Sequence, residues 1–284
     1  MLGHLIKHEF RATGRRMLPT LGVLALLGLL ANLSIRLLES GFGDGTVLRI
    51  LLVLFVIAFF VGITVAWIMT LVLMISRFYR NLLQDEGYLM FTLPANTHEL
   101  IWSKLIVSTV WFLLTGLLTG LLMFLTVANL VNLSGDDLNV MFVGLGEALD
   151  MLRDMGVTNS SLVLLLVEML AAVVLGCLTT SLQFYAAMGL GQMSATRKGL
   201  WSVLAFIGLS IAFQIISSAL LGGLGNSDSI DLVINSFETM IQTAPGTVRA
   251  ANSGIGITML VELLQGAVLY VITALSLSKK LNLA

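Results

Sequence analysis

The sequence predicts an all-α membrane protein that crosses the bilayer six times. Of its 284 residues, 57% are hydrophobic and only 11% are charged, and the apolar residues gather in six long runs. Soluble domains contain about 25% charged residues, so this chain has too little polar surface for an aqueous environment. The polar stretches between the runs are too short to bury a core of their own, and we predict a single transmembrane domain over residues 1–284.

Each run is long enough to cross the hydrocarbon core of a bilayer, which takes about 20 residues of helix. The runs lie near residues 18–38, 48–76, 101–131, 161–190, 200–222 and 256–278. The second, third and fourth exceed the minimum length, so we expect them to tilt or to extend past the bilayer. We expect Pro19, Pro94 and Pro245 to lie in the gaps between spans.

The distribution of lysine and arginine predicts that both termini are cytoplasmic. With that orientation, only Arg36, Arg49, Arg153 and Arg249 lie on the outer side, and every other lysine and arginine lies inside. An excess of basic residues in cytoplasmic loops is the main determinant of membrane topology.

Polar stretches outside the spans contain amphipathic patterns. Residues 1–16 place Leu2, Leu5 and Phe10 on one face and cations on the other, as in a helix at the inner membrane interface. Glu9 interrupts the apolar face, so it either pairs with an arginine of another element or the helix packs on protein. On the outer side, the segments 132–160 and 224–254 each contain an amphipathic helical pattern, and we expect both to lie on the outer leaflet.

The segment 77–100 carries most of the patterned polar residues of the cytoplasmic side. Residues 77–93 continue the second span and then turn near Asp85-Glu86-Gly87, and Pro94 ends any helix. Asn96, followed by Glu99 three residues later, predicts a capping box that opens the third span. A short helix held between two long ones can transmit a push from a soluble partner into the membrane.

Four short motifs in this region resemble the coupling-helix region of ABC type-2 permeases, the membrane subunits of ATP-binding-cassette exporters. They are Asp85-Glu86-Gly87, Leu93-Pro94, Glu99-Leu100 and Ser103-Lys104, between the second and third of six spans. The basic N-terminal helix resembles the elbow helix of that family. The C-terminal Leu-Ser-Lys-Lys-Leu-Asn-Leu resembles the basic tails of its bacterial members, although the outer segment after the third span is longer than the family leads us to expect.

The resemblance implies a subunit of the bacterial plasma membrane with two kinds of partner. One is an ABC ATP-binding subunit, and the other is a second copy of the permease or a homologous permease; membrane lipids surround both. Six residues would couple the chain to the ATPase: Arg80, Asp85, Glu86, Gly87, Tyr88 and Pro94.

The chain is not predicted to be an enzyme by itself. It contains no Gly-x-x-x-x-Gly-Lys-[Ser/Thr] phosphate loop, so ATP and Mg²⁺ would be bound by the partner subunit and no cofactor by this chain. His4 and His8 have a spacing that two metal ligands can use, but a site needs three or four, and we predict no metal site. Nothing in the composition predicts a nucleic-acid partner.

Five polar side chains inside the spans are candidates for a substrate cavity: Glu168, Glu262, Gln183, Gln214 and Gln265. Ionisable residues within spans usually face the interior of a helix bundle. The two carboxylates would attract a cationic or amphipathic substrate if they line the cavity. The stronger alternatives are that they pair with Arg36 or Arg49 at the outer boundary, or that they are held neutral. For the glutamines, hydrogen bonds between helices are the stronger alternative.

The sequence therefore favours a permease subunit that exports a hydrophobic or amphipathic compound, such as a drug, an antimicrobial peptide or a lipid-like molecule. The alternatives are an ion-coupled secondary transporter and a non-transporting membrane sensor or immunity protein. An intramembrane enzyme is disfavoured, because the lone Cys177 has no histidine at its depth.

Overall fold

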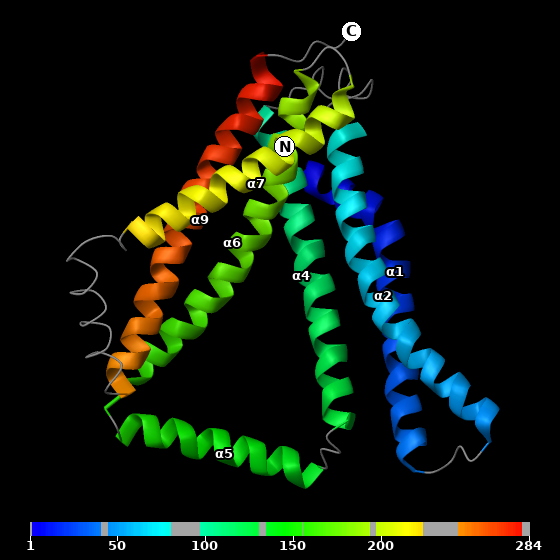
Figure 1. The fold of residues 1–284 in the computed structure, drawn as a ribbon. Coiled ribbons are helices and arrows are strands. Elements are labelled where there is room, and N and C mark those ends of the chain that lie inside the picture. The colour runs from blue at the N-terminus through cyan, green and yellow to red at the C-terminus, as the bar shows by residue number, and fades with distance from the viewer. Residues whose placement is uncertain are drawn as a thin grey trace. The chain divides into compact units, whose positions relative to one another are not determined.

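The computed structural model describes residues 2–40, 45–80, 97–130, 135–154, 156–193, 197–223 and 244–279, which are helical apart from short turns (Figure 1). Within these ranges lie seven helices: α1 (Leu2–Glu39), α2 (Thr46–Phe78), α4 (Thr97–Leu130), α5 (Gly135–Asp154), α6 (Asn159–Gln192), α7 (Lys198–Gly223) and α9 (Ala244–Lys279).

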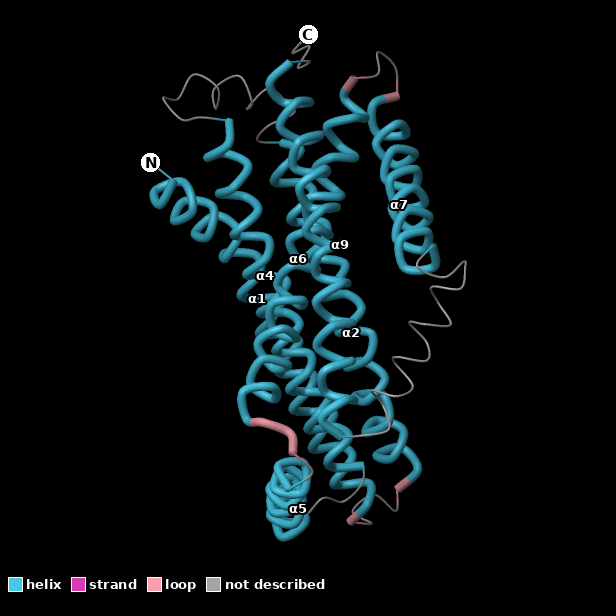
Figure 2. The backbone as a smooth tube through the Cα atoms, turned by 90° about the vertical axis from the view of Figure 1, so that its left-hand side faces the viewer, coloured by secondary structure: helices cyan, strands magenta, loops and turns pink. Residues whose placement is uncertain are grey.

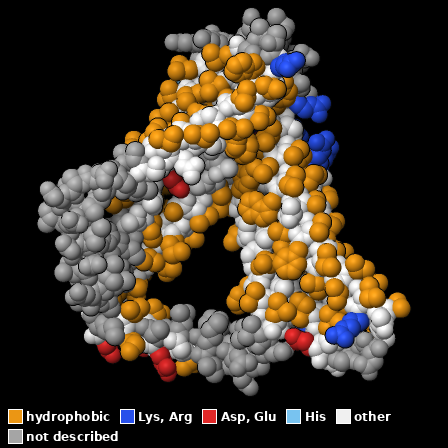
Figure 3. Space-filling view, viewed as in Figure 1, with side chains coloured by type: hydrophobic (Ala, Val, Ile, Leu, Met, Phe, Trp, Pro, Cys, Tyr) orange, Lys and Arg blue, Asp and Glu red, His pale blue; other side chains and the backbone are white. Residues whose placement is uncertain are grey.

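Six of these helices are long and apolar enough to cross a membrane, which confirms the all-α fold class and the predicted number of spans. The qualifying stretches are Leu2–Glu39, Thr46–Phe78, Thr97–Leu130, Asn159–Gln192, Lys198–Ser218 and Gly254–Leu277. Apolar side chains cover the flanks of the described helices (Figure 3). This is the surface that a multi-pass membrane protein presents to lipid.

The first helix differs from the prediction, because α1 runs without interruption through Pro19. The expectation that Pro19 lies in a gap between helices is therefore wrong. A proline within a helix removes one backbone hydrogen bond and kinks the helix, and Figure 2 shows the first turns of α1 at an angle to the rest. Residues 2–16, expected as a separate interfacial helix, are continuous with the first span.

The other two prolines differ from each other. Pro245 lies in the first turn of α9, where the missing N–H would have no helical partner in any case. Helix α9 begins at Ala244, whereas the sixth span was predicted to begin near residue 256. Pro94 lies outside the described residues.

The chain divides into two compact helical units, and the first of them holds α1, α2 and α4. Helix α1 packs along both α2 and α4, whereas α2 and α4 touch over a shorter stretch. Glu9 of α1 contacts Lys104 of α4, and further along both helices Asn32 contacts Thr126. Residue numbers rise in the same direction on both helices, so α1 and α4 are parallel. The core between the three helices contains Leu24, Ala31, Phe59, Ala66 and Leu122.

The second unit holds α6, α7 and α9 and has the same packing order. Helix α6 packs along both α7 and α9. It is parallel to α9, since Asn252 donates a hydrogen bond to the Ser161 carbonyl near the start of both helices and Gly189 meets Ser276 near their ends. In each unit the first helix is therefore central, and it is parallel to the third.

Helix α5 follows α4 in the sequence and confirms a helix within the predicted outer segment 132–160. It ends in a tight turn in which Gly156, at φ 90°, donates its N–H to the Arg153 carbonyl. Glycine adopts this left-handed conformation at little cost, and helices commonly end this way. The second predicted outer helix, over residues 230–241, lies outside the described residues.

Candidate functional site: buried polar groups between the helices

A buried ion pair joins α1 to α4. Glu9 Oε1 lies 2.5 Å from Lys104 Nζ, and the two side chains are 10% and 3% exposed. Taking two charges out of water is unfavourable unless they meet in good geometry. The pair therefore holds the two helices in one register, because a shift of either helix would separate the charges.

A chain of hydrogen bonds continues from this pair along the same interface. The Trp111 indole N–H donates to Thr13 Oγ1 at 2.9 Å, and the Thr13 hydroxyl donates to the Glu9 carbonyl at 2.7 Å. The rings of Phe10 and Trp111 pack with their centroids 6.0 Å apart. The first turns of α4 are thus fixed to the first turns of α1 by one ion pair, one hydrogen-bond relay and one aromatic contact.

The sequence indicated only one half of this site. Glu9 was expected to pair with an arginine of another element or to lie where the helix packs on protein. The partner is the lysine Lys104, and residues Glu9, Thr13, Gly14 and Met17 are buried, so this part of α1 packs on protein. The available signal was a lysine at the fourth position of the third apolar run, where a charge is unfavourable unless it is paired.

A second polar cluster ties the other end of the same two helices. Asn32 donates to Thr126 Oγ1 at 3.2 Å, and Asn129 donates to Asn32 Oδ1 at 2.6 Å. Arg36 Nε donates to Asn129 Oδ1 at 2.8 Å. This cluster was not predicted, although two asparagines within apolar runs were a signal for it.

The two carboxylates within the second unit lie on its parallel helices. Glu168 is on α6 and Glu262 is on α9. In each of them Oε2 is buried and has no hydrogen-bond partner, and neither carboxylate forms an ion pair within the described part of the second unit. Arg36, named above as a possible partner, donates from Nε to Asn129 Oδ1 within the first unit.

The three glutamines predicted near the substrate path have different environments. Gln183 Nε2 on α6 donates to Ser210 Oγ on α7 at 2.7 Å. Gln265 Nε2 on α9 donates to Ser217 Oγ on α7 at 2.6 Å. Gln214 is exposed. The first two side chains thus fix α7 to its neighbours, as polar groups in spans commonly do.

Most of the predicted coupling residues cannot be placed. Asp85, Glu86, Gly87, Tyr88 and Pro94 lie outside the described residues. Arg80 is described, and it is exposed at the end of a short π-helical turn that follows α2.

The residues flanking the undescribed segment 81–96 are well packed. Phe78 is buried before it, and Leu100 and Ile101 are buried after it. The ion-paired Lys104 follows within one turn of Ile101. Both helix ends that lead into the segment therefore belong to a firmly packed part of the first unit.

Metal-binding clusters are absent from the described part of the chain. It contains no group of three or more His, Cys, Asp or Glu side chains that could hold an ion. His4 and His8 are both exposed on the first turns of α1. Their spacing alone supports no site.

The fold and composition define a class, that of multi-pass helical membrane proteins with six candidate spans. Beyond that class, a comparison with protein-family models, with curated proteins and with solved structures finds no match.

Proposed function

We propose that this chain is the permease subunit of an ATP-driven exporter of the ABC type-2 kind. In this proposal it lies in a bacterial plasma membrane with both termini in the cytoplasm. It binds a separate ATP-binding subunit through residues 77–100 and pairs with a second permease. It moves a hydrophobic or amphipathic compound outward and binds no nucleotide itself.

The observation that supports the proposal most is the buried ion pair directly after the segment that resembles a coupling helix. A force on residues 81–96 acts on the start of α4, where Lys104 is bound to Glu9. Because this pair and the Trp111–Thr13 hydrogen bond fix α4 to α1, both helices would move together. A partner that hydrolyses ATP could drive the membrane helices through such a connection.

A reversal of charge in the segment tests the docking part of this proposal. Glu86→Lys is expected to abolish co-purification of the ATPase in mild detergent and, with it, ATP-dependent export. Glu147→Lys is the matched control, since it makes the same charge change at an exposed position of α5. The proposal is wrong if the ATPase binds and export continues with Glu86→Lys, or if no ATPase accompanies the unmodified protein.

A second variant separates binding of the ATPase from the transmission of its movement to the membrane helices. Glu9→Gln combined with Lys104→Met removes both charges of the pair and leaves the segment unchanged. The ATPase should still co-purify and hydrolyse ATP, while export per ATP hydrolysed should fall several-fold. Unchanged coupling would show that the ion pair has no part in transmission.

An ion-coupled secondary transporter is the second candidate, and one observation favours it. Glu168 and Glu262 each have a buried carboxylate oxygen without a hydrogen-bond partner, and intramembrane carboxylates often form ion pathways. In proteoliposomes that contain this chain alone, a proton or sodium gradient should then drive transport, and Glu262→Gln should abolish it. Transport that needs ATP and a second protein would exclude this candidate.

A further inference from the structure

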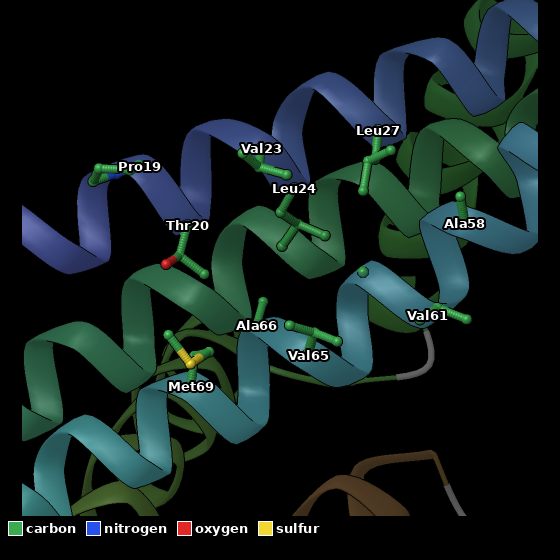
Figure 4. A pocket seen from close by; sticks show the side chains of 11 residues that line it. Pro19, Thr20, Val23, Leu24, Leu27, Ala58, Val61, Val65, Ala66 and Met69 are labelled. Atoms are coloured by element: carbon green, nitrogen blue, oxygen red, sulfur yellow. The ribbon is translucent and has the colours of Figure 1, made fainter.

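An apolar groove of ≈ 510 Å³ lies between α1 and α2 in the first unit (Figure 4). Its volume is within the range of about 300–1,000 Å³ that is usual for ligand sites. Among the residues that line it are Thr20, Val23 and Leu27 from α1 and Val61, Val65 and Met69 from α2. The lining includes neither residue of the ion pair described above.

The shape of the groove follows from small residues on α2. Ala58, Gly62 and Ala66 recur at four-residue spacing and line it. A Cβ at Gly62 would lie 2.9 Å from Leu27 Cδ1, so the helices approach closely there. Val61 and Val65 stand beside this strip and are 56% and 50% exposed.

The lining of the groove is almost entirely apolar and therefore suits a hydrocarbon chain. Thr20 is its one polar side chain, and the Thr20 hydroxyl already donates to the Arg16 carbonyl at 2.9 Å. No lining side chain therefore has a proton left to donate to a polar ligand, and the Thr20 oxygen is the one strong side-chain acceptor. An apolar chain loses nothing on entering, whereas a polar group would be desolvated without compensation.

A cation lies directly beyond one end of this lining. Arg16, Thr20, Val23 and Leu27 recur at three- and four-residue spacing and so share one face of α1. Arg16 is exposed and forms no ion pair with a described residue. Along the helix axis it lies only about 6 Å from Thr20, since each residue rises about 1.5 Å.

The charge around Arg16 is uniformly positive on this helix. Lys7, Arg11 and Arg15 are also exposed on the first turns of α1. Glu9 is the one acidic residue in these turns, and it is buried against Lys104. A phosphate near Arg16 would therefore meet cations and no opposing carboxylate from α1.

We propose that this groove binds one anionic phospholipid, with an acyl chain along Thr20–Leu27 and the phosphate at Arg16. The lining of α1 from Thr20 to Leu27 spans about 10 Å, which suits the upper part of one acyl chain. The combination of an apolar groove and a cation at its end fits an amphipathic anion, and apolar side chains cover the flank of α2 in Figure 3.

Native mass spectrometry tests the site on the full-length protein. The protein is released from nanodiscs of phosphatidylcholine and phosphatidylglycerol at three to one, and the retained lipids are counted. Val65→Trp fills the groove and should remove the retained phosphatidylglycerol. Val53→Trp is the control, because Val53 is also exposed on α2 but does not line the groove.

The headgroup contact has its own pair of variants. Arg16→Ala should reduce retention of phosphatidylglycerol about fivefold, the effect expected of one cation at a membrane surface. Arg15→Ala removes another exposed cation, on a different face of α1, and should have a smaller effect. In nanodiscs of phosphatidylcholine alone, Arg16→Ala should change nothing.

Three results would overturn the proposal. The first is retention of phosphatidylglycerol that is insensitive to both Val65→Trp and Arg16→Ala. The second is an equal effect of Arg15→Ala and Arg16→Ala, which would indicate a general surface charge with no specific site. The third is a change from dimer to monomer with Val65→Trp at constant lipid count, which would mean that a second copy of the chain occupies the groove.

Discussion

Replacement of Lys104 by methionine should destabilise the protein more than replacement of any exposed charged residue that the structure describes in the first unit. The methionine fills similar space but leaves the Glu9 carboxylate, only 10% exposed, without the ammonium now 2.5 Å away. Breaking a buried ion pair by removing one partner costs about 3–5 kcal/mol. We therefore expect the free energy of unfolding to fall by roughly this amount, as measured by titrating detergent-solubilised protein with SDS and following helix content by circular dichroism.

Two further variants make this test decisive. Glu9→Gln added to Lys104→Met should recover most of the lost stability, since replacing both charges of a buried pair is often neutral or stabilising by about 1–4 kcal/mol. Lys7→Met is the control, because Lys7 is exposed on the same helix and surface changes usually stay within about 0.5 kcal/mol. The reasoning fails if Lys104→Met costs no more than Lys7→Met.

Three other predictions concern packing within the units. Asn32→Leu removes the two hydrogen bonds that join Asn32 to α4, and the unfolding free energy should fall by about 1–2 kcal/mol in the same SDS titration. Gly191→Ala places a Cβ 2.6 Å from a backbone nitrogen of α7 and should cost about 1–3 kcal/mol; Gly176→Ala, with no atom within 4 Å, should be neutral. Backbone amide hydrogen exchange should be slower at the α1–α4 contact than at the α6–α9 contact, because an ion pair and several side-chain hydrogen bonds join α1 to α4. Equal protection at the two contacts would contradict the expectation that these polar pairs stabilise the first contact more.

The six spans could be predicted from sequence because membrane helices are selected by length and apolar content, which a single chain displays directly. The error at Pro19 has a physical cause. In water a proline normally ends a helix, whereas in a membrane a broken backbone bond would stay unsatisfied, so the helix continues with a kink. The need to satisfy backbone hydrogen bonds in a membrane thus outweighs the usual tendency of proline to end a helix.

The polar pairs could not be predicted, because each depends on which helices are neighbours. Glu9 stood out as a misplaced charge, but the choice between its possible partners requires the parallel packing of α1 on α4. Gln183 and Gln265 show the same limit: their sequence positions allow either a substrate contact or a helix contact, and the serines of α7 satisfy them.

The two units share a packing order but differ in the polar groups on their parallel helices. Between α1 and α4 a carboxylate meets an ammonium. On α6 and α9, at nearly the same separation along the chain, stand Glu168 and Glu262, and neither pairs with a cation in the described part of the second unit. An ion pair fixes the register of two helices, because a shift of either helix would separate the charges. We infer that the Glu9–Lys104 pair suits α1 and α4 to transmit force as one body.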